Sequence, residues 1–408
     1  MPQLLEYGCQ ARVDLDVPTE QLLAMCAEPL GAPLDDLAAT VEAALDGPLN
    51  FPPLARATVP GDQIVLAVEH SLPQSAGLVA AVARHLVEHG AAADHLTVLS
   101  TPEAAATGED DPRDQLPESW RREVKVEVHA PENKSGLALL GLSEEGRPIY
   151  LNRTLLEADL VVPIGCLRDE AALGYHGQYG GLFPTFAEAK IRARFQKLAA
   201  PKTARRRAAA QRAQIDEMGW LMGTQFTVQA LPGGGDRLLN VLAGEIPAVF
   251  RQGQTAYRAA WSCEVPRRAS LVIASLSGGA AQQTWENLAR ALAAALRVSV
   301  EGGAIALCTE LACEPGDAVR SLSGADEPTL ALRRIAREAM PDAQIAAEVV
   351  RALDQGKVYL LSRLDEALVD ELGLVPIGDL GDLGRLARRH ESCVVLAHAQ
   401  FALPTVPE

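Results

Sequence analysis

The sequence predicts an α/β protein of two domains with a cleft between them. Three observations support this class. The 408 residues exceed the length of one ordinary domain, short β-branched runs alternate with amphipathic helical segments, and hydrophobic residues make up 48% of the chain, enough for a sizeable core. Because the strands are almost continuous apolar runs, we expect parallel sheets.

The first half of the chain shows the alternation most clearly. Residues 4–18 alternate apolar and polar side chains, as a short strand pair does before Pro18, and Thr19 is expected to begin a short helix. Gly47 and Pro48 end a predicted helix. Further on, the pattern predicts strands at 61–69, 94–100 and 158–166, helices at 35–46 and 75–90, and an exposed polar excursion at 101–120.

A domain boundary is predicted near residues 266–270. Beyond it, a strand with a glycine pair, a long helix and further strands repeat the same alternation at 269–279, 282–299, 302–312, 357–364 and 392–404. We therefore assign residues 1–267 to an N-terminal α/β domain, 268–392 to a smaller C-terminal α/β domain, and 393–408 to a strand that returns to the N-terminal domain.

Composition narrows the expected partners and location. The net charge of −16 repels phosphate backbones, so nucleic acid is not an expected partner. The sequence has no uninterrupted apolar stretch of about 18 residues and no signal pattern at its start, so no membrane association is expected. Seven scattered cysteines, an odd number, predict reduced thiols in a cytoplasm.

Basic residues concentrate in one helical segment, residues 186–218. They are Lys190, Arg192, Arg194, Lys197, Lys202, Arg205, Arg206, Arg207 and Arg212. A solvated amphipathic helix is the simpler interpretation. The alternative is an interaction or scaffold protein that uses this Arg-rich helix.

A glycine-rich loop, GYHGQYGGLFP at 174–184, is the strongest local signal for a site. It follows a buried strand, and its glycines permit close approach of the backbone to a ligand. A tight structural loop is the alternative. The candidate side chains and backbone positions here are Arg168, Glu170, Tyr175, His176 and Gly177.

A second signal is the glycine pair in SLSGGAAQQTWENL at 275–288. A strand that runs through Gly278 and Gly279 into a helix would aim free N–H groups at an anion. Gln283 and Trp285 are candidates to line such a pocket. Helix capping explains these residues equally well.

A third signal is Glu69, His70 and Ser71, at the end of a predicted strand. A carboxylate beside an imidazole can orient a base. A polar turn before the next helix is the alternative interpretation.

Spacing typical of metal ligands is poor throughout. Cys308 and Cys313 lack a matching second pair. His85 and His89 have the i, i+4 spacing of two ligands, but the helix is amphipathic and ends there, so we interpret them as solvated side chains. No metal ligand is predicted.

Several phrases in the same order resemble the lactate racemase family. They are AALDGPLNFPPLARATVPGDQIVLAVEHSLP, NRTLLEADLVVPIG, the glycine-rich loop and VIASLSGG. The resemblance implies a two-domain α/β fold with the active site in the cleft. It also implies a nickel-pincer nucleotide that exchanges hydride with a 2-hydroxy acid, and two histidine bases.

The family's catalytic positions carry over only in part. Its Asp-x-Thr-Arg-Pro loop corresponds to Glu69–Pro73, which lacks the arginine, and its Gly-x-His corresponds to LSTPEAA, which lacks the histidine. The family's cofactor-tethering lysine has no counterpart in the glycine-rich loop, and no histidine occurs between His176 and His390. Glu69, His70, Glu170 and His176 remain as catalytic candidates.

We therefore predict a lactate-racemase-like protein that keeps the fold and the cleft, lacks nickel-pincer racemase activity, and binds a small anion such as a hydroxy acid. No cofactor is expected; a nickel-pincer nucleotide would have to be held without the lysine tether. The alternative is a 2-hydroxyacid racemase or epimerase with a rearranged site and a non-covalently held nickel cofactor.

Overall fold

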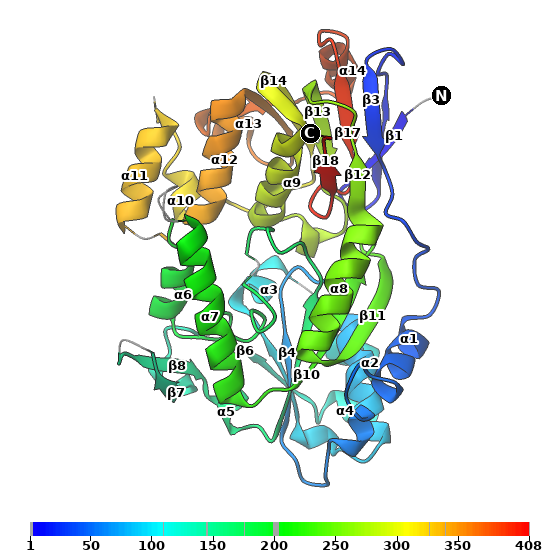
Figure 1. Cartoon of the computed structure of the whole chain (residues 1–408), viewed down its shortest axis with the longest axis vertical. Coiled ribbons are helices and arrows are strands. Elements are labelled where there is room, and N and C mark those ends of the chain that lie inside the picture. Colours follow the sequence, from blue (N-terminus) through cyan, green and yellow to red (C-terminus); the bar gives the residue numbers. More distant parts are fainter. Residues whose placement is uncertain are drawn as a thin grey trace.

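Two α/β halves, each built on a six-stranded sheet, make up the molecule (Figure 1). The computed structural model describes residues 3–108, 110–143, 146–174, 176–198, 204–325, 327–338 and 340–407. Both sheets are mostly or wholly parallel. The predicted two-domain α/β class is therefore confirmed.

The first sheet has the strand order β11-β10-β9-β4-β5-β6, and only the β10–β11 pair is antiparallel. Its strands are β4 (Ile64–Val68), β5 (Leu96–Ser100), β6 (Lys125–Val128), β9 (Leu160–Cys166), β10 (Phe226–Pro232) and β11 (Leu238–Glu245). Central strand β4 is buried along its whole length, because helices and loops cover both faces of the sheet.

The second sheet has the strand order β16-β15-β14-β13-β17-β3 and is parallel throughout. Its strands are β3 (Leu22–Cys26), β13 (Ala269–Ser275), β14 (Ser299–Cys308), β15 (Lys357–Leu361), β16 (Val375–Pro376) and β17 (Cys393–Leu396). The short helix expected after Thr19 is wrong: the segment LLAMC is strand β3, because it completes the edge beside β17.

The start of the chain lies in the second half rather than where the predicted limits placed it. Residues 393–408 contact both halves, because β17 lies in the second sheet whereas Phe401 and Leu403 join an apolar cluster of the first half. Residues 22–26, assigned to the N-terminal domain, add β3 to the second sheet, and β17 of the segment 393–408 pairs with it. The last strand, β18 (Leu403–Thr405), pairs in parallel with β12 (Ser262–Glu264). Two separate hairpins, β1–β2 and β7–β8, complete the strands: β1 (Gln3–Tyr7), β2 (Ala11–Leu15), β7 (Leu137–Leu142) and β8 (Pro148–Asn152).

Helices pack on the sheets and build four apolar clusters. In the first half, α1, α2 and α8 contribute to one cluster and α5, α6 and α7 to the opposite one; in the second half, α9, α12 and α13 pack on one face and β1, β2 and α14 on the other. The bounds are α1 (Leu37–Asp46), α2 (Ser75–Glu88), α3 (Pro102–Thr107), α4 (Glu118–Arg121), α5 (Arg153–Glu157), α6 (Ala189–Gln196), α7 (Ala204–Met222), α8 (Ile246–Trp261), α9 (Trp285–Val298), α10 (Asp317–Arg320), α11 (Pro328–Glu338), α12 (Ala343–Gln355), α13 (Glu366–Glu371) and α14 (Gly381–Ala387). Among the described helices, none has both the length and the apolar run needed to cross a bilayer.

Cys26 and Cys263 form a disulfide, so the expectation of seven reduced thiols is wrong for these two. Cys26 ends β3, where the chain leaves the second sheet, and Cys263 lies in β12, where it returns from α8. The two residues are 237 positions apart in the sequence, so only the tertiary fold brings them together. The other five cysteines are free.

Candidate functional site

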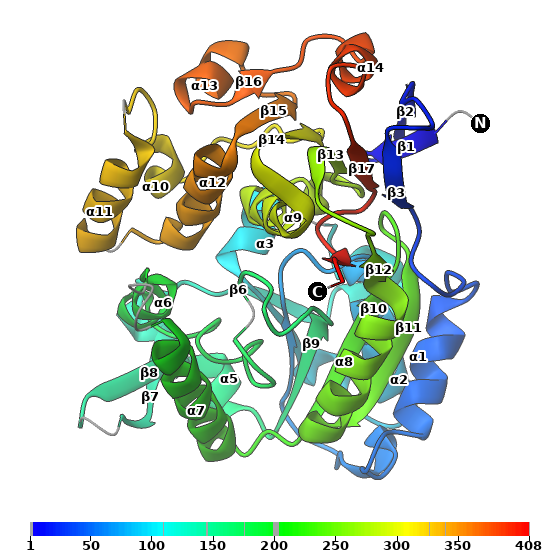
Figure 2. The same ribbon diagram turned by 45° about the horizontal axis from the view of Figure 1, so that its top comes forward.

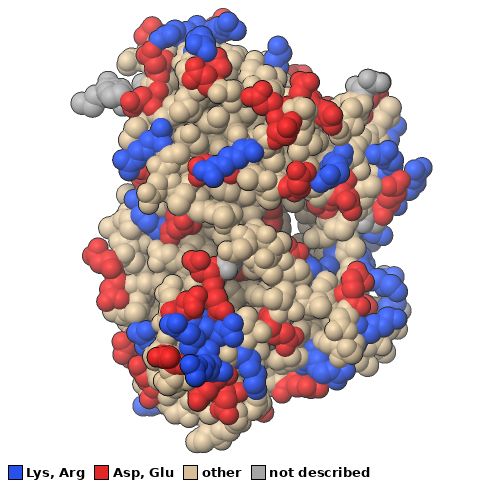
Figure 3. Space-filling view, turned by 180° about the vertical axis from the view of Figure 1, so that it is seen from behind, with Lys and Arg blue, Asp and Glu red and all other residues tan. Residues whose placement is uncertain are grey.

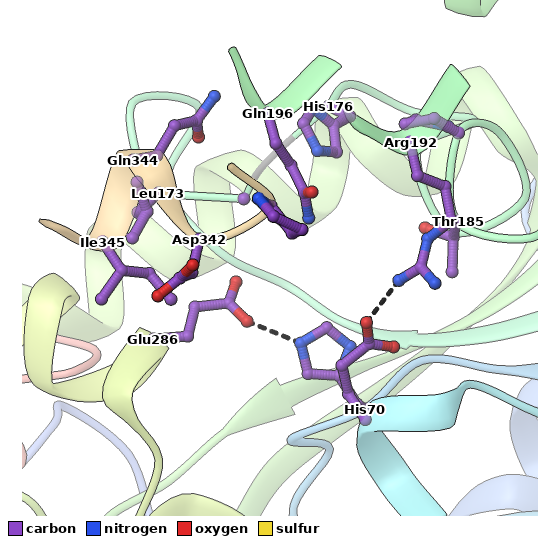
Figure 4. Close-up of a pocket in the computed structure, with 14 residues that line it drawn as sticks. His70, Leu173, His176, Thr185, Arg192, Gln196, Glu286, Asp342, Gln344 and Ile345 are labelled. Carbon is purple, nitrogen blue, oxygen red and sulfur yellow. Dashed lines mark hydrogen bonds and ion pairs between the residues drawn. The ribbon is translucent and has the colours of Figure 1, made fainter. Parts of the chain in front are cut away.

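A cavity of about 240 Å³ lies between the two halves (Figure 4). The first half contributes residues that follow β4, β5 and β9, and the second half contributes the start of α9 and of α12. In both sheets the carboxyl ends of parallel strands thus point toward the cavity. Open α/β sheets bind ligands at this edge. Its lining residues are His70, Glu103, Leu173, Gly174, His176, Pro184, Thr185, Arg192, Gln196, Glu286, Pro341, Asp342, Gln344 and Ile345.

His70 and Glu286 join the two walls. His70 Nε2 lies 2.6 Å from Glu286 Oε2, as the dashed line in Figure 4 marks. Burial alone would lower the pKa of His70, but the Glu286 carboxylate outweighs burial and raises it above the ordinary 6.5. Because Glu286 holds Nε2–H, the Nδ1 atom of His70 is left to exchange a proton with a ligand.

Arg290, one turn further along α9, bonds the other oxygen of Glu286. Burial opposes ionisation of Glu286, but Arg290 and His70 outweigh it and lower the pKa of this carboxyl. Burial and the nearby Arg168 lower the pKa of Arg290 to about 10, so Arg290 stays charged at neutral pH. The three side chains form one ion-paired chain from the first half to the second.

A second ion pair, Arg192 with Glu103, lies at the cavity wall. Arg192 comes from α6 and Glu103 from α3, in a stretch that the sequence predicted to be an exposed excursion. Burial raises the pKa of Glu103, but Arg192 outweighs it and lowers the pKa overall. Gln196, one turn after Arg192, also lines the cavity, and no hydrogen bond of its side chain occurs within the described part of the chain.

The glycine-rich loop closes directly over two carboxylates. Gly174 has φ +76°, and a Cβ atom there would overlap Glu286 Oε1. Gly181 stands in the same relation to Glu69, and a Cβ at Gly165 would lie 2.6 Å from Glu69 Oε2. A side chain at any of these positions would have to displace a carboxylate, so glycine is favoured there.

Glu69 lies behind His70 and outside the cavity lining. Its Oε2 accepts the N–H of Cys166 at 3.3 Å. Burial raises the pKa of the Glu69 carboxyl, more than the nearby backbone and cationic groups lower it. Glu69 thus packs against the glycine-rich loop at Gly181, and its neighbour His70 is the residue that lines the cavity.

His176 lines the cavity opposite His70 (Figure 4). Burial lowers its pKa to about 4, so the ring is neutral at pH 7. A neutral imidazole can both donate and accept one hydrogen bond. His70 and His176 therefore differ in role: the first is the group that takes a proton near neutrality.

The other candidates of the first half lie away from this cavity. Ser71 is buried at φ +56° and its carbonyl accepts from buried Arg168 at 3.0 Å. Glu170 is exposed and lines neighbouring grooves, and Gly177 lines one of these. Tyr175 lies outside the described residues.

The glycine pair of the second half is filled by the chain itself. Asp236 Oδ2 accepts the N–H of Gly279 at 2.7 Å. Gln283 Nε2 donates to the Gly278 carbonyl at 3.0 Å, and Trp285 Nε1 donates to the Cys313 carbonyl at 2.9 Å. An anion does sit at this turn as the sequence suggested, but it is a side chain of the protein, and none of these candidates lines the cavity.

Several basic residues of the Arg-rich segment bond to the protein itself. Arg207 donates to the carbonyls of Leu198 and Arg194, and Arg212 donates to the carbonyl of Glu170. Lys190 and Lys197 are exposed, and no lysine lines the cavity within the described residues. Lys202 and the side chain of Arg205 lie outside the described part.

Sequence reasoning missed Glu103, Arg192 and Glu286 as site residues. Glu286 and Arg290 do carry a local signal, because an acidic and a basic residue at i, i+4 follow the glycine pair. Glu103 and Arg192 carry no such local signal, since they are 89 positions apart.

Comparison with known proteins places this cavity in a known fold. Residues 7–204 match the family described as lactate racemase N-terminal domain. The lactate racemase apoprotein from Thermoanaerobacterium thermosaccharolyticum superimposes with a TM-score of 0.77 at 16% identity, over 99% of this chain and 100% of that one. Residues 7–204 therefore belong to the lactate racemase N-terminal domain family, and the whole chain has the fold of lactate racemase.

A second solved structure, a protein from Thermotoga maritima, superimposes on this lactate racemase-like chain with a TM-score of 0.67. Its identity is 13%, over 93% of this chain and 100% of that one. No curated protein sequence matches the chain. At these identities the superpositions establish the fold, and the chemistry of the cleft has to be argued from its own residues.

Proposed function

We propose that this lactate racemase-like protein binds a small anion of the 2-hydroxy acid class in the interdomain cavity and lacks nickel-pincer racemase activity. The observation that carries the proposal is the cavity itself. It offers the Nδ1 of His70, the Arg192 guanidinium and the side-chain amide of Gln196 to one small ligand. A volume of about 240 Å³ suits a molecule of a few heavy atoms.

The residues present do not fit the nickel-pincer nucleotide that the family resemblance implies. No lysine lines the described cavity wall, so the covalent tether has no candidate. The cavity is also smaller than the roughly 300 Å³ at which pockets for larger ligands begin. We therefore derive no step through this cofactor.

Ligand binding would depend on two positive groups. Protonated His70 donates from Nδ1, and Arg192 donates from the atoms that Glu103 leaves free, so that a carboxylate meets two donors. Glu286 keeps His70 oriented and favours its protonated form. The glycine-rich loop approaches Glu286 closely at Gly174.

The binding proposal is tested by calorimetric titration of the full chain with lactate and glycolate. We expect saturable binding that His70→Asn and Arg192→Gln weaken at least about tenfold, as loss of a charge-assisted hydrogen bond predicts. The matched control is Arg194→Gln, because Arg194 lies on the same helix but bonds Gln214 outside the cavity. Equal affinity in all variants, or no saturable binding, would contradict the proposal.

A second candidate is a 2-hydroxyacid racemase or epimerase with a rearranged site, favoured by the His70–Glu286 pair. A carboxylate-oriented imidazole is suited to move the hydroxyl proton of a substrate. Co-expression of the protein with the enzymes that form the cofactor distinguishes the two candidate functions. We expect no nickel, no visible absorbance, no adduct in the intact mass and no racemisation of D-lactate; stoichiometric nickel with racemisation would favour the enzyme.

We further propose a cytoplasmic protein without a nucleic-acid partner. Acidic and basic side chains are interspersed over the face in Figure 3, which is hollowed where the two halves meet, and five cysteines are free thiols. Disulfides are rare in the cytosol, and the Cys26–Cys263 bond is one that this proposal has to accommodate. Rapid thiol trapping in cells, followed by mass spectrometry, should find the other five cysteines reduced; oxidation of the exposed Cys9 and Cys313 would point to another compartment.

A further inference from the structure

A second group of ligand-type side chains lies on α1 and α2, and none of them lines the cavity. Asp46 is the last residue of α1, His85 lies in the last turn of α2, and His89 caps that helix. One ligand atom from each lies within 4.8 Å of the other two. The two helices run side by side in both ribbon views (Figures 1 and 2) and contact one another.

His85 is the first sign that something is bound here. Only 4% of the residue is exposed, and neither ring nitrogen has a hydrogen-bond partner among the residues that the structure describes. Burying such polar atoms without a partner is costly, and native proteins rarely do so. Ligand-type atoms of His89 and Asp46 lie within 4.8 Å of a ring nitrogen of His85, and the two imidazole centroids are 4.3 Å apart.

His89 is already oriented as a metal ligand. Its Nδ1 lies 2.8 Å from the His85 carbonyl oxygen, so Nδ1–H donates and Nε2 carries the free lone pair. Metal-binding histidines usually donate their second N–H in this way, to a carbonyl or a carboxylate. The i, i+4 spacing places both rings on one face of α2.

Charge at the cluster favours a cation. Asp46 is exposed and makes no salt bridge within the described residues, so its negative charge is not neutralised there by a basic side chain. The other three-residue cluster, Glu6, Glu28 and His398, differs: Arg237 lies 3.3 Å from Glu28. That carboxylate already has its cation.

We propose that Asp46, His85 and His89 bind a divalent late transition-metal ion, Zn²⁺ in the first instance, which fastens the end of α1 to the end of α2. Two imidazole nitrogens and one carboxylate oxygen are ligands that Zn²⁺ prefers, and water completes the coordination. Affinity for such N/O sites rises toward Cu²⁺ along the first-row series. The site is separate from the interdomain cavity, so it holds whether or not the proposed function does.

Calorimetry of the tag-free, EDTA-treated full chain with ZnCl₂ tests the site. We expect one ion per chain, with the affinity lowered at least about tenfold by His89→Ala and by Asp46→Ala. Both residues lie at the surface end of a helix, so the fold should persist; His85 is buried and is not replaced. Three controls should bind as the parent protein does: His390→Ala, Glu28→Gln for the other cluster, and His70→Asn for the cavity.

Two further readouts separate this site from adventitious binding. Zn²⁺ should raise the melting temperature of the parent protein, because the ion binds only the folded state, and should not raise that of His89→Ala. Electron paramagnetic resonance of the Cu²⁺ form should show two coordinated nitrogens in the parent and one in His89→Ala. No stoichiometric Zn²⁺, or unchanged affinity in both variants, would overturn the proposal.

Discussion

The two glycine-rich turns of this protein differ in what occupies them. The loop that contains Gly174 and Gly181 packs on two carboxylates and borders an open cavity. The pair Gly278 and Gly279 is closed by Asp236, which accepts the Gly279 N–H at 2.7 Å. Both turns have the same sequence character, so glycine content alone does not distinguish a ligand site from a turn that the chain fills itself.

Both carboxylates come from the opposite half, and the difference lies in what each one binds. Glu286 bonds His70 and Arg290, and it lines the cavity between the halves. Asp236, in the β10–β11 turn, bonds the glycine pair itself, so its carboxylate occupies the position an external anion would take. The loop at Gly174 can therefore bind a ligand, whereas the turn at Gly278 and Gly279 is a structural contact between the halves.

The largest expected effect is on the buried ion pair under the first loop. Glu286→Ala leaves Arg290, which is 8% exposed, without its partner, and should lower the free energy of unfolding by about 3–5 kcal/mol. Glu157→Ala is the matched control, because Arg153–Glu157 is also an i, i+4 pair but is exposed, and should cost about 0.5 kcal/mol. Urea unfolding measures both; equal losses would mean that the cleft pair is an ordinary surface pair.

Close approach at the first loop should have the next largest effect. Gly174→Ala places a methyl group against Glu286 at positive φ, and should cost about 3 kcal/mol. Gly223→Ala has a similar φ of +69° with nothing within 4 Å, so it should cost only the backbone term of about 1 kcal/mol. If the two variants unfold at the same urea concentration, contact with Glu286 is not what requires glycine at 174.

At the second turn, Asp236→Ala should cost about 1–2 kcal/mol, since the Gly279 N–H loses its acceptor. It should also create an anion site, so that sulfate restores part of the loss. Sulfate stabilises many proteins, and Asp62→Ala serves as the control, because Asp62 also accepts a backbone N–H, from Val59, in a turn without a glycine pair. If sulfate stabilises both variants equally, Asp236→Ala has not created an anion site at the glycine pair.

The smallest effect on stability, and the most specific, is the titration of His70. Its pKa is raised by Glu286, so the ion pair stabilises the fold at low pH and this contribution is lost as pH rises through the raised pKa. NMR of the ring signals should find His70 titrating above 6.5 and His176 at about 4. Glu286→Gln should lower the pKa of His70. If the pKa of His70 is unchanged in this variant, Glu286 is not what raises it.

Anion binding gives the same titration a functional readout. Protonated His70 is one of the two proposed donors, so affinity for lactate should fall as pH rises through the His70 pKa. If the affinity for lactate stays constant across this pH range, His70 does not bind the anion, and Arg192 remains as the proposed donor.

Much of the fold was predictable because its signals are local. The runs that become β4, β5, β9 and β13 are almost purely apolar, and only a strand covered on both faces explains them. Glu69 and His70 were found because they follow such a strand directly. The partners of His70 were not found, since Glu286 is 216 positions away.

The segment 22–26 shows the limit of local reasoning. LLAMC has no alternation and no β-branched residue, and its state is set by the free edge of β17, contributed from the other end of the chain. The Cys26–Cys263 bond has the same origin. In both cases the deciding energy is a contact between distant residues, which no window of sequence contains.

The sequence by itself determined the class of the fold and the strand ends at which Glu69 and His70 lie. Hydrophobic periodicity and the identity of single residues are written in local order, so these conclusions needed no coordinates. The tertiary structure alone decided that Asp236 fills one glycine turn, that Glu286 leaves the other open, and that Asp46 meets His85 and His89. Each of these outcomes is a contact between residues far apart in the sequence. Such a contact is fixed only by the packing of the whole folded chain.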